Sequence, residues 1–161
     1  TWEGVQAEAW MLAAQDTSLN DSSLVLRLQY GRRSILLTGD IEARAEAALA
    51  VHLPPTDLLT APHHGSQTSS TEALLRAVAP QAVIISCGDR NRFGFPHAPV
   101  LARYAGFGID VWRTDDDGRV SCETDGAFWY VEGWRGRRAT YAGADRSPSS
   151  PRTVSSMAAV R

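Results

Sequence analysis

The strongest constraint on the fold is a short apolar run, Ile35-Leu36-Leu37, which lies between the polar residues Ser34 and Thr38. Because neither face of this run is polar, it is typical of a strand that is buried on both sides of a sheet. Leucines at every second position from 24 to 28 predict a half-buried strand just before it. Turn residues at 30–32 join the two segments, so the sequence predicts a β-hairpin.

Strands and helices alternate along the rest of the chain. Helices are predicted at residues 41–51, near Ser69, and from Pro99, which suits a first helical turn, to about Tyr104. Ser69 with Glu72 three residues later resembles a capping box. Further strands are predicted at residues 5–12, 57–60, 82–86, 110–113, 119–123 and 127–132. This order predicts an α/β fold.

The composition limits the class of protein. Of the 161 residues, 43% are hydrophobic and 21% are charged, as in a globular domain. The net charge of −2 gives no overall attraction to nucleic acid, so any DNA contact depends on a local patch.

Residues 1–143 are predicted to form the domain, and residues 144–161 are predicted to be a disordered tail, because they show no periodicity. Two isolated cysteines, Cys87 and Cys122, are predicted to be small buried apolar side chains.

Candidate metal ligands stand where two of the predicted strands stop. Asp40 comes directly after Gly39, and His63 and His64 come shortly after the strand at 57–60. Open α/β sheets bind ligands at the carboxyl ends of their strands. Imidazole and carboxylate groups suit zinc, and carboxylate-rich sites suit manganese. The alternative interpretation is a simple turn at Gly39-Asp40 and a structural or solvent-exposed histidine pair.

Several motifs, taken together, are more specific. Leu36-Leu37-Thr38-Gly39-Asp40 is similar to the fourth metal motif of the metallo-β-lactamase superfamily. Residues 61–70, Ala-Pro-His-His-Gly-Ser-Gln-Thr-Ser-Ser, resemble a PHHGS…TSS signature, and residues 90–97 resemble an NRFGHPH loop. Residues 20–27 and 113–118 resemble two further segments of the same family. The order and spacing of these segments, from about Asn20 to Cys122, resemble the ComEC/Rec2 family of DNA-uptake proteins.

The resemblance implies a metallo-β-lactamase αββα sandwich, of which this chain would form the second half, with a mixed β-sheet flanked by helices. The main metal motif of the superfamily, His-x-His/Asp-x-Asp-His, does not occur in the chain and would lie upstream of Thr1. We therefore expect an exposed apolar sheet face and an incomplete site if the present residues stand alone. Phe95 stands where the family loop usually has histidine, so no role is carried over to it.

The resemblance also implies roles for individual residues. Asp40 would be a carboxylate that bridges two metals, zinc or manganese, in the complete domain. His64 is the candidate metal ligand and His63 the candidate catalytic group, and the reverse assignment is the alternative. Arg92 and His97 would bind the DNA backbone. Residues 133–138, where Trp134 stands among arginines, are either a single-strand-binding surface or a hairpin tip.

Proteins of the ComEC/Rec2 family form an inner-membrane channel that takes up one DNA strand in natural transformation. The resemblance implies that this domain is a metal-dependent nuclease, that it degrades the other strand, and that it lies on the periplasmic face. Its partners would be DNA, the membrane channel of the same full-length protein and the missing N-terminal half of the domain. The alternatives are a degenerate domain that helps to assemble or gate the channel, and another metallo-hydrolase of the superfamily.

Overall fold

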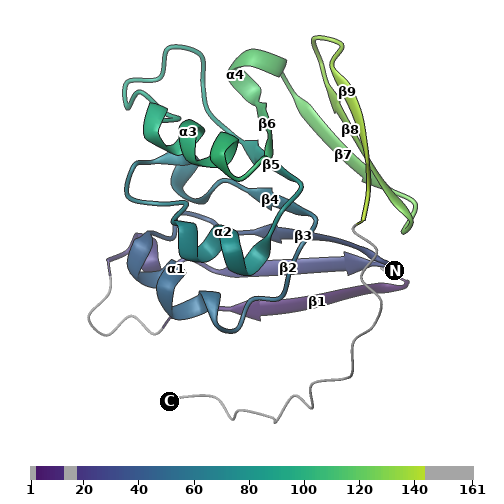
Figure 1. The fold of residues 1–161 in the computed structure, drawn as a ribbon, viewed down its shortest axis with the longest axis horizontal. Coiled ribbons are helices and arrows are strands. Elements are labelled where there is room, and N and C mark those ends of the chain that lie inside the picture. Colours follow the sequence, from purple (N-terminus) through teal and green to yellow (C-terminus); the bar gives the residue numbers. More distant parts are fainter. Residues whose placement is uncertain (1–2, 13–17, 144–161) are drawn as a thin grey trace.

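A mixed six-stranded sheet, here called sheet A, forms the centre of the molecule (Figure 1). The computed structural model describes residues 3–12 and 18–143, so the tail predicted at 144–161 lies outside the described residues. β1, β2 and β3 are antiparallel, whereas β3 to β6 are parallel. In sheet order, the strands are β1 (Val5–Trp10), β2 (Val25–Tyr30), β3 (Arg33–Leu37), β4 (Leu58–Thr60), β5 (Ala82–Ile85) and β6 (Asp110–Arg113).

The β2–β3 hairpin is built as its sequence pattern predicts. Leu26 lies opposite Leu37 on one face of the sheet, and Leu28 lies opposite Ile35 on the same face. Leu36 points to the other face and is fully buried. The continuous apolar run in β3 is therefore explained by apolar packing on both faces of one strand.

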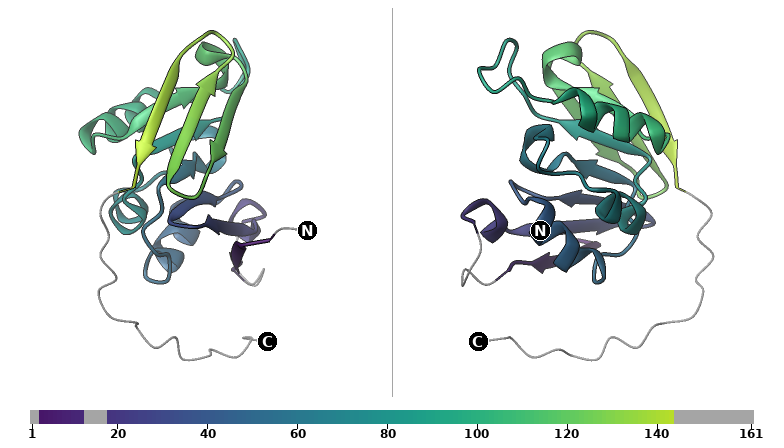
Figure 2. Two further views of the ribbon diagram at one scale, coloured as in Figure 1. Left: turned by 90° about the vertical axis from the view of Figure 1, so that its right-hand side faces the viewer. Right: turned by 60° about the vertical axis from the view of Figure 1, so that its left-hand side comes forward.

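Three helices cover one face of sheet A (Figures 1 and 2). They are α1 (Ala43–Ala50), α2 (Glu72–Val78) and α3 (Ala98–Gly106), and a short helical turn, α4 (Thr114–Asp117), follows β6. Successive residues of a strand point to opposite faces, so every second strand residue meets these helices. The core on this face includes Val25, Leu36, Ile41, Leu49, Leu59, Leu74, Leu75, Val78, Val83, Ile85, Val100 and Tyr104.

A separate three-stranded antiparallel sheet, here called sheet B, packs on the opposite face. It consists of β7 (Val120–Thr124), β8 (Phe128–Gly133) and β9 (Arg138–Ala142). Buried Trp129 and Val131 of β8 meet Trp112, Ala82 and Leu58 of sheet A in a second core. β9 was not predicted from the sequence, because Arg138–Ala142 is exposed at alternate positions and has little apolar signal. Residues 134–137 form the tip of the β8–β9 hairpin, one of the two interpretations of that segment.

At the β1–β2 end, sheet A exposes apolar side chains on the face that sheet B covers elsewhere. Leu24 is 57% exposed and Tyr30 is 41% exposed. Leu26 and Leu28 on the same face are only half-buried within the described part of the chain. The apolar surface expected from an unpartnered sheet is thus present at this end.

The start of α2 differs from the predicted capping box. The N-cap is Thr71, whose hydroxyl accepts a hydrogen bond from the Leu74 amide. Ser69 instead donates its hydroxyl to the Pro62 and Ser66 carbonyl oxygens. The carboxylate of buried Glu46, on α1, accepts the Ser70 and Thr71 amides at 2.5 and 2.6 Å. This tertiary contact fixes the backbone before the helix and moves the helix start to Glu72.

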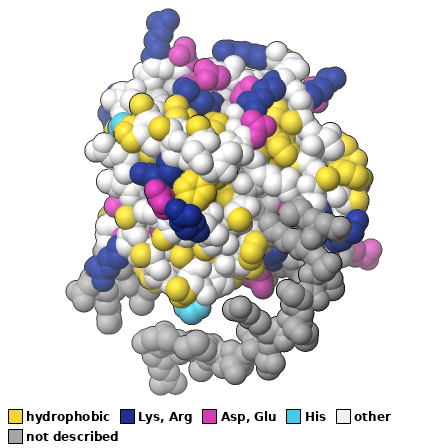
Figure 3. Space-filling model, in the orientation of Figure 1, with side chains coloured by type: hydrophobic (Ala, Val, Ile, Leu, Met, Phe, Trp, Pro, Cys, Tyr) yellow, Lys and Arg dark blue, Asp and Glu magenta, His cyan; other side chains and the backbone are white. Residues whose placement is uncertain are grey.

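The molecular surface carries charges of both signs. Figure 3 shows Arg side chains interspersed with Asp and Glu over the face that bears the helices. This mixture agrees with the net charge of −2. Among the described helices, none has both the length and the apolar character that crossing a bilayer requires.

Removing the Glu46 carboxylate should destabilise the fold. Glu46→Ala leaves two amides without their acceptor and opens a cavity between α1 and α2, which should cost about 3 kcal/mol of unfolding free energy. The control is Glu72→Ala on α2, where an exposed carboxylate pairs with Arg76; that change should cost less than about 0.5 kcal/mol. Urea denaturation measures both, and equal losses would contradict the assigned role.

The same carboxyl group should make stability depend on pH. Burial is the largest influence on Glu46 and raises its pKa above the ordinary 4.5, so the folded chain binds this proton more tightly than the unfolded chain. The free energy of unfolding should therefore fall as pH rises from 4.5 toward the higher folded-state pKa. Urea denaturation of wild type and Glu46→Gln across that pH range measures the free energy of unfolding of each protein. If the difference in unfolding free energy between the two proteins stays constant with pH, the predicted role of Glu46 is contradicted.

Candidate metal centre

The site is built where two parallel neighbours, β3 and β4, end at the same edge of sheet A. Beyond β3 the chain turns at Gly39 into Asp40, and beyond β4 it enters a short 3-10 turn, η2 (Pro62–Gly65). Two hydrogen bonds tie the segments together: the His63 amide donates to the Gly39 carbonyl at 3.1 Å, and the Thr38 hydroxyl donates to the Thr60 carbonyl at 2.9 Å. Asp40 and the histidine pair are thus held on neighbouring backbones.

Both histidines have a left-handed backbone. The φ angle is 47° at His63 and 55° at His64, a region that residues other than glycine seldom occupy. Such a conformation costs free energy and persists only where the surroundings impose it. Next to them, Gly65 has a φ of 81°, and a Cβ there would lie 2.7 Å from Cβ of Pro96. The 88–97 loop therefore packs against η2 only because residue 65 has no side chain.

His64 and Asp40 face each other. The His64 Nε2 lies 3.5 Å from the Asp40 Oδ1. On the other side of the ring, Nδ1 lies 2.7 Å from the carbonyl oxygen of Ser86, which only accepts hydrogen bonds, so Nδ1 carries the proton and donates it. In the neutral ring, Nε2 then presents its lone pair toward the carboxylate. Two ligands of one tetrahedral zinc ion lie about 3.4 Å apart, so this pair fits a shared cation.

His63 is held by a carboxylate instead. Its Nδ1 lies 3.1 Å from Oε1 of Glu42, and that oxygen also accepts the Thr68 hydroxyl at 2.9 Å. A carboxylate paired with one imidazole nitrogen fixes the ring and strengthens the other nitrogen as a base. His63 is therefore suited to proton transfer through Nε2. Sequence reasoning missed Glu42, whose only signal is its position two residues after Asp40.

The two residues predicted to contact DNA lie at the rim. The His97 Nδ1 accepts the Gln67 amide at 3.1 Å, so the neutral ring carries its proton on Nε2 and is a hydrogen-bond donor there. The Arg92 guanidinium lies over the Phe93 ring, 4.7 Å from its centroid. Phe95 lies between these groups and the site, with its ring centroid 5.2 Å from that of His97 and 5.5 Å from that of His63.

A cavity of about 650 Å³ opens over the site. The structure brings Asp40, His63 and His64 together in its wall, whereas Arg92 and His97 do not line it. Asn91 holds the covering loop: its amide donates to the Phe95 carbonyl at 2.7 Å, and its side-chain oxygen accepts the Phe95 amide at 2.9 Å. The full lining is Asp40, His63, His64, Ser86, Cys87, Gly88, Asn91, Phe93 and Phe95.

Cys87 borders the cavity as a protonated thiol. Burial and a hydrogen bond to the Asp115 carboxylate raise the pKa of Cys87 to about 11, and its Sγ lies 3.1 Å from Asp115 Oδ1. The Arg113 guanidinium lowers the pKa of Asp115, so the Asp115 carboxyl stays ionised and accepts this hydrogen bond.

The second cysteine, Cys122, is half-buried in the second core. Both cysteines are free thiols rather than disulfide partners.

The described residues supply two converging metal ligands, with His63 and its partner Glu42 beside them. In residues 3–12 and 18–143, no group of three or more His, Cys, Asp or Glu side chains converges as a metal site would require. The Asp40–His64 pair therefore fits part of a coordination shell.

Comparison with known proteins shows the relationship. The family model of the metallo-β-lactamase superfamily matches residues 18–89. ComE operon protein 3 of Bacillus subtilis is 38% identical over 110 residues, which cover 67% of this chain and 14% of that protein. Recombination protein 2 of Haemophilus influenzae is 42% identical over 101 residues, or 63% of this chain and 13% of that protein. Competence protein ComA of Neisseria gonorrhoeae is 33% identical over 124 residues, or 74% of this chain and 18% of that protein.

The fold and the matched residues define a metallo-β-lactamase-fold domain, which confirms the predicted fold class. Within that superfamily, the chain belongs to the ComEC/Rec2 family of DNA-uptake proteins. The chain spans less than a fifth of the length of each of these relatives.

Zinc binding tests the paired ligands. Asp40→Ala and His64→Ala should each weaken zinc affinity at least about tenfold, because each removes one of two converging donor atoms. Isothermal titration calorimetry of the chain at neutral pH measures this. The matched control is His52→Ala, which removes an exposed imidazole after the end of α1. Equal zinc affinity in all three variants would refute the site.

Proposed function

We propose that the chain is the part of a DNA-uptake protein that hydrolyses phosphodiester bonds of the non-transported DNA strand with a divalent metal. The observation that carries this proposal is the Asp40–His64 pair, 3.5 Å apart, with the His64 proton fixed on Nδ1 by the Ser86 carbonyl. This arrangement leaves a carboxylate oxygen and an imidazole lone pair facing one spot at the ends of adjacent strands.

Asp40 and His64 are the residues of this chain that would hold a divalent cation, and Asp40 would be the carboxylate shared by two ions if an upstream motif supplied the remaining ligands. When bound, zinc or manganese polarises the phosphate and lowers the pKa of an attacking water. The fixed tautomer of His64 means that no proton has to leave Nε2 before a metal binds there. The backbone hydrogen bonds between the two segments hold these ligands in place.

His63 supplies the proton to the leaving group. Glu42 accepts the Nδ1 hydrogen, so a protonated His63 carries its second proton on Nε2, beside the metal ligands. As the phosphorus–oxygen bond breaks, this proton passes to the leaving oxygen, and the imidazole returns to its neutral form. The Glu42 carboxylate holds the ring in this orientation through Nδ1.

Arg92 and His97 contact the DNA backbone outside the cavity. Their exposed guanidinium and Nε2 hydrogen are donors to phosphate oxygens, which position a strand without reading its sequence. The other partners are the membrane channel of the same full-length protein and the upstream half of the domain. The exposed apolar surface near Leu24 and Tyr30 suits contact with that half. We place the domain on the periplasmic face of the inner membrane.

One observation favours a second candidate function, a degenerate domain that helps to assemble or gate the channel. In the described part of the chain, the ligands at the site are two rather than three or four. A scaffold would need the fold but no complete metal centre. Hydrolysis of another phosphodiester or ester by the same site is the further alternative.

Nuclease activity of the natural full-length protein decides between these functions. With manganese or zinc, Asp40→Ala should lower the rate of DNA cleavage about a thousandfold. His63→Ala should lower it about a hundredfold, because the proton donor to the leaving oxygen is lost. His52→Ala should cleave DNA as fast as wild type.

Full activity of Asp40→Ala would defeat the mechanism. If the wild type cleaves no DNA with either metal, yet Asp40→Ala takes up DNA normally, the scaffold function is supported instead. Faster cleavage of a non-nucleic phosphodiester than of DNA would support another metallo-hydrolase.

A further inference from the structure

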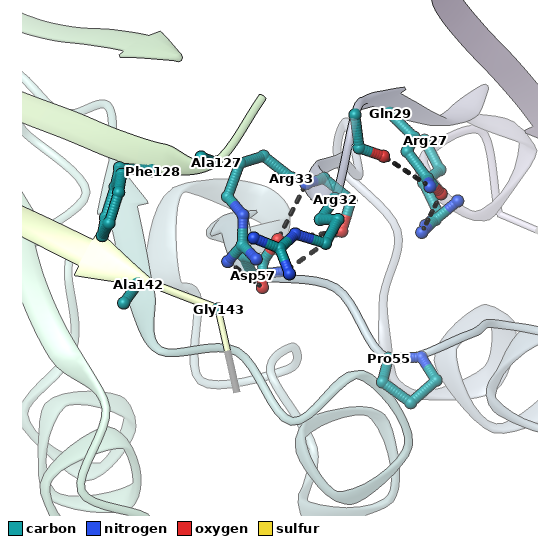
Figure 4. Close-up of a pocket in the computed structure, with 12 residues that line it drawn as sticks. Arg27, Gln29, Arg32, Arg33, Pro55, Asp57, Ala127, Phe128, Ala142 and Gly143 are labelled. Atoms are coloured by element: carbon teal, nitrogen blue, oxygen red, sulfur yellow. Dashed lines mark hydrogen bonds and ion pairs between the residues drawn. The ribbon is translucent and has the colours of Figure 1, made fainter. Parts of the chain in front are cut away.

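A second pocket lies at the opposite end of β3 from Asp40. It has a volume of about 480 Å³ and is formed between the β2–β3 turn and the end of sheet B (Figure 4). Arg33 begins β3 and Leu37 ends it, so the length of the strand, about 13 Å, separates this pocket from the metal centre. The lining residues include Arg27, Arg32, Arg33, Asp57, Phe128 and Gly143.

Arg33 is a buried cation whose hydrogen bonds are incomplete. Its side chain is 5% exposed, and its contact with Asp57, from Nη1 to Oδ1, is 3.4 Å long. The other Asp57 oxygen already accepts the Ser34 amide at 2.8 Å. The Nε hydrogen of Arg33 has no acceptor among the described residues. A guanidinium has five donors, and a buried donor without a partner destabilises the fold unless a further acceptor binds.

The charges around the pocket favour an anion. Three arginines line it against a single carboxylate, Asp57. Arg27 is fixed by hydrogen bonds to Gln29 and Thr56 and by an ion pair with Glu8 at 3.0 Å. Arg32 is exposed, and Figure 4 shows its side chain beside that of Arg33 and next to Asp57. The arginines in the pocket wall therefore carry more positive charge than the described carboxylates neutralise.

Gly143 makes room for the Arg33 guanidinium. A Cβ at this position would lie 1.8 Å from Nη1 and 1.9 Å from Nη2, so any side chain would displace the charged group. On the same side of the pocket, Phe128 of β8 is 40% exposed and provides an apolar wall. A buried guanidinium, an exposed guanidinium and an aromatic side chain in one cavity match a phosphate with an attached base or sugar.

We propose that this pocket binds a phosphate group, carried by a nucleotide or by a DNA strand, through Arg33 and Arg32. Arg33 contributes a buried guanidinium charge to the pocket wall, and exposed Arg32 adds a second guanidinium. Asp57 holds Arg33 in place and leaves the pocket positive. Binding here needs neither a metal nor Asp40, so the pocket is independent of the proposed hydrolysis.

Titration of the Asp40→Ala chain in a chelating, metal-free buffer tests the proposal with three probes: inorganic phosphate, AMP and a short oligothymidylate. All three should bind, and Arg32→Gln should weaken each about fivefold. Arg33→Gln should weaken binding about tenfold or more, and Gly143→Ala should weaken it with the charge unchanged. The matched control, Arg138→Gln, removes an exposed guanidinium that pairs with Glu132 at the far end of β9 and should bind like the parent.

The probes also identify the source of the phosphate. Tighter binding of oligothymidylate than of AMP indicates a DNA strand, and the reverse indicates a free nucleotide; either result supports the site. Arg32→Gln decides the proposal even if Arg33→Gln unfolds, because Arg32 is exposed. The absence of binding by all three probes, or equal binding by the parent, Arg32→Gln and Arg138→Gln, would overturn it.

Discussion

The parallel pairing of β3 with β4 is the contact on which the site depends. The side chain of Thr38 bonds to the backbone of Thr60, and the His63 amide bonds to the Gly39 carbonyl, so the two chains leave the sheet together. A shift of either strand by one residue would turn its side chains to the other face of the sheet. Both cores would be lost with it, since neighbouring residues of β3 serve opposite faces. The geometry of the site is therefore held by the same packing that stabilises the fold.

Three histidines near the site differ in what each Nδ1 contacts, and this difference separates their chemistry. A carbonyl oxygen holds the proton on Nδ1 of His64 and leaves Nε2 as an electron-pair donor. A carboxylate holds Nδ1 of His63 and leaves Nε2 free for proton transfer. An amide donates to Nδ1 of His97 and leaves a hydrogen on Nε2, which suits contact with a phosphate oxygen. One residue type is thus held by three different backbone or side-chain partners.

β3 connects two regions of opposite character. Its carboxyl end leads to carboxylate and imidazole groups that suit a cation, and its amino end carries Arg33 in a pocket that suits an anion. The core between them is apolar, with Leu36 fully buried on one face and Ile35 packed against the second core on the other. The two regions are therefore separated by the apolar packing of one strand.

The sequence by itself determined the elements with strong periodicity and pointed to the residues of the candidate metal site. The β2–β3 hairpin, the strand before the histidine pair and the helix at Pro99 were predicted, because apolar spacing and turn residues act locally. Asp40, His63 and His64 were predicted from motifs that follow strand ends, and the structure brings them together in one cavity wall. The tertiary structure decided the rest. Glu46 on α1 moved the start of α2, and β9 formed because Trp129 and its neighbours had a sheet to pack against. The Nδ1 atoms of His64, His63 and His97 contact Ser86, Glu42 and Gln67, which lie 22, 21 and 30 residues away in the chain. No local sequence pattern records such contacts.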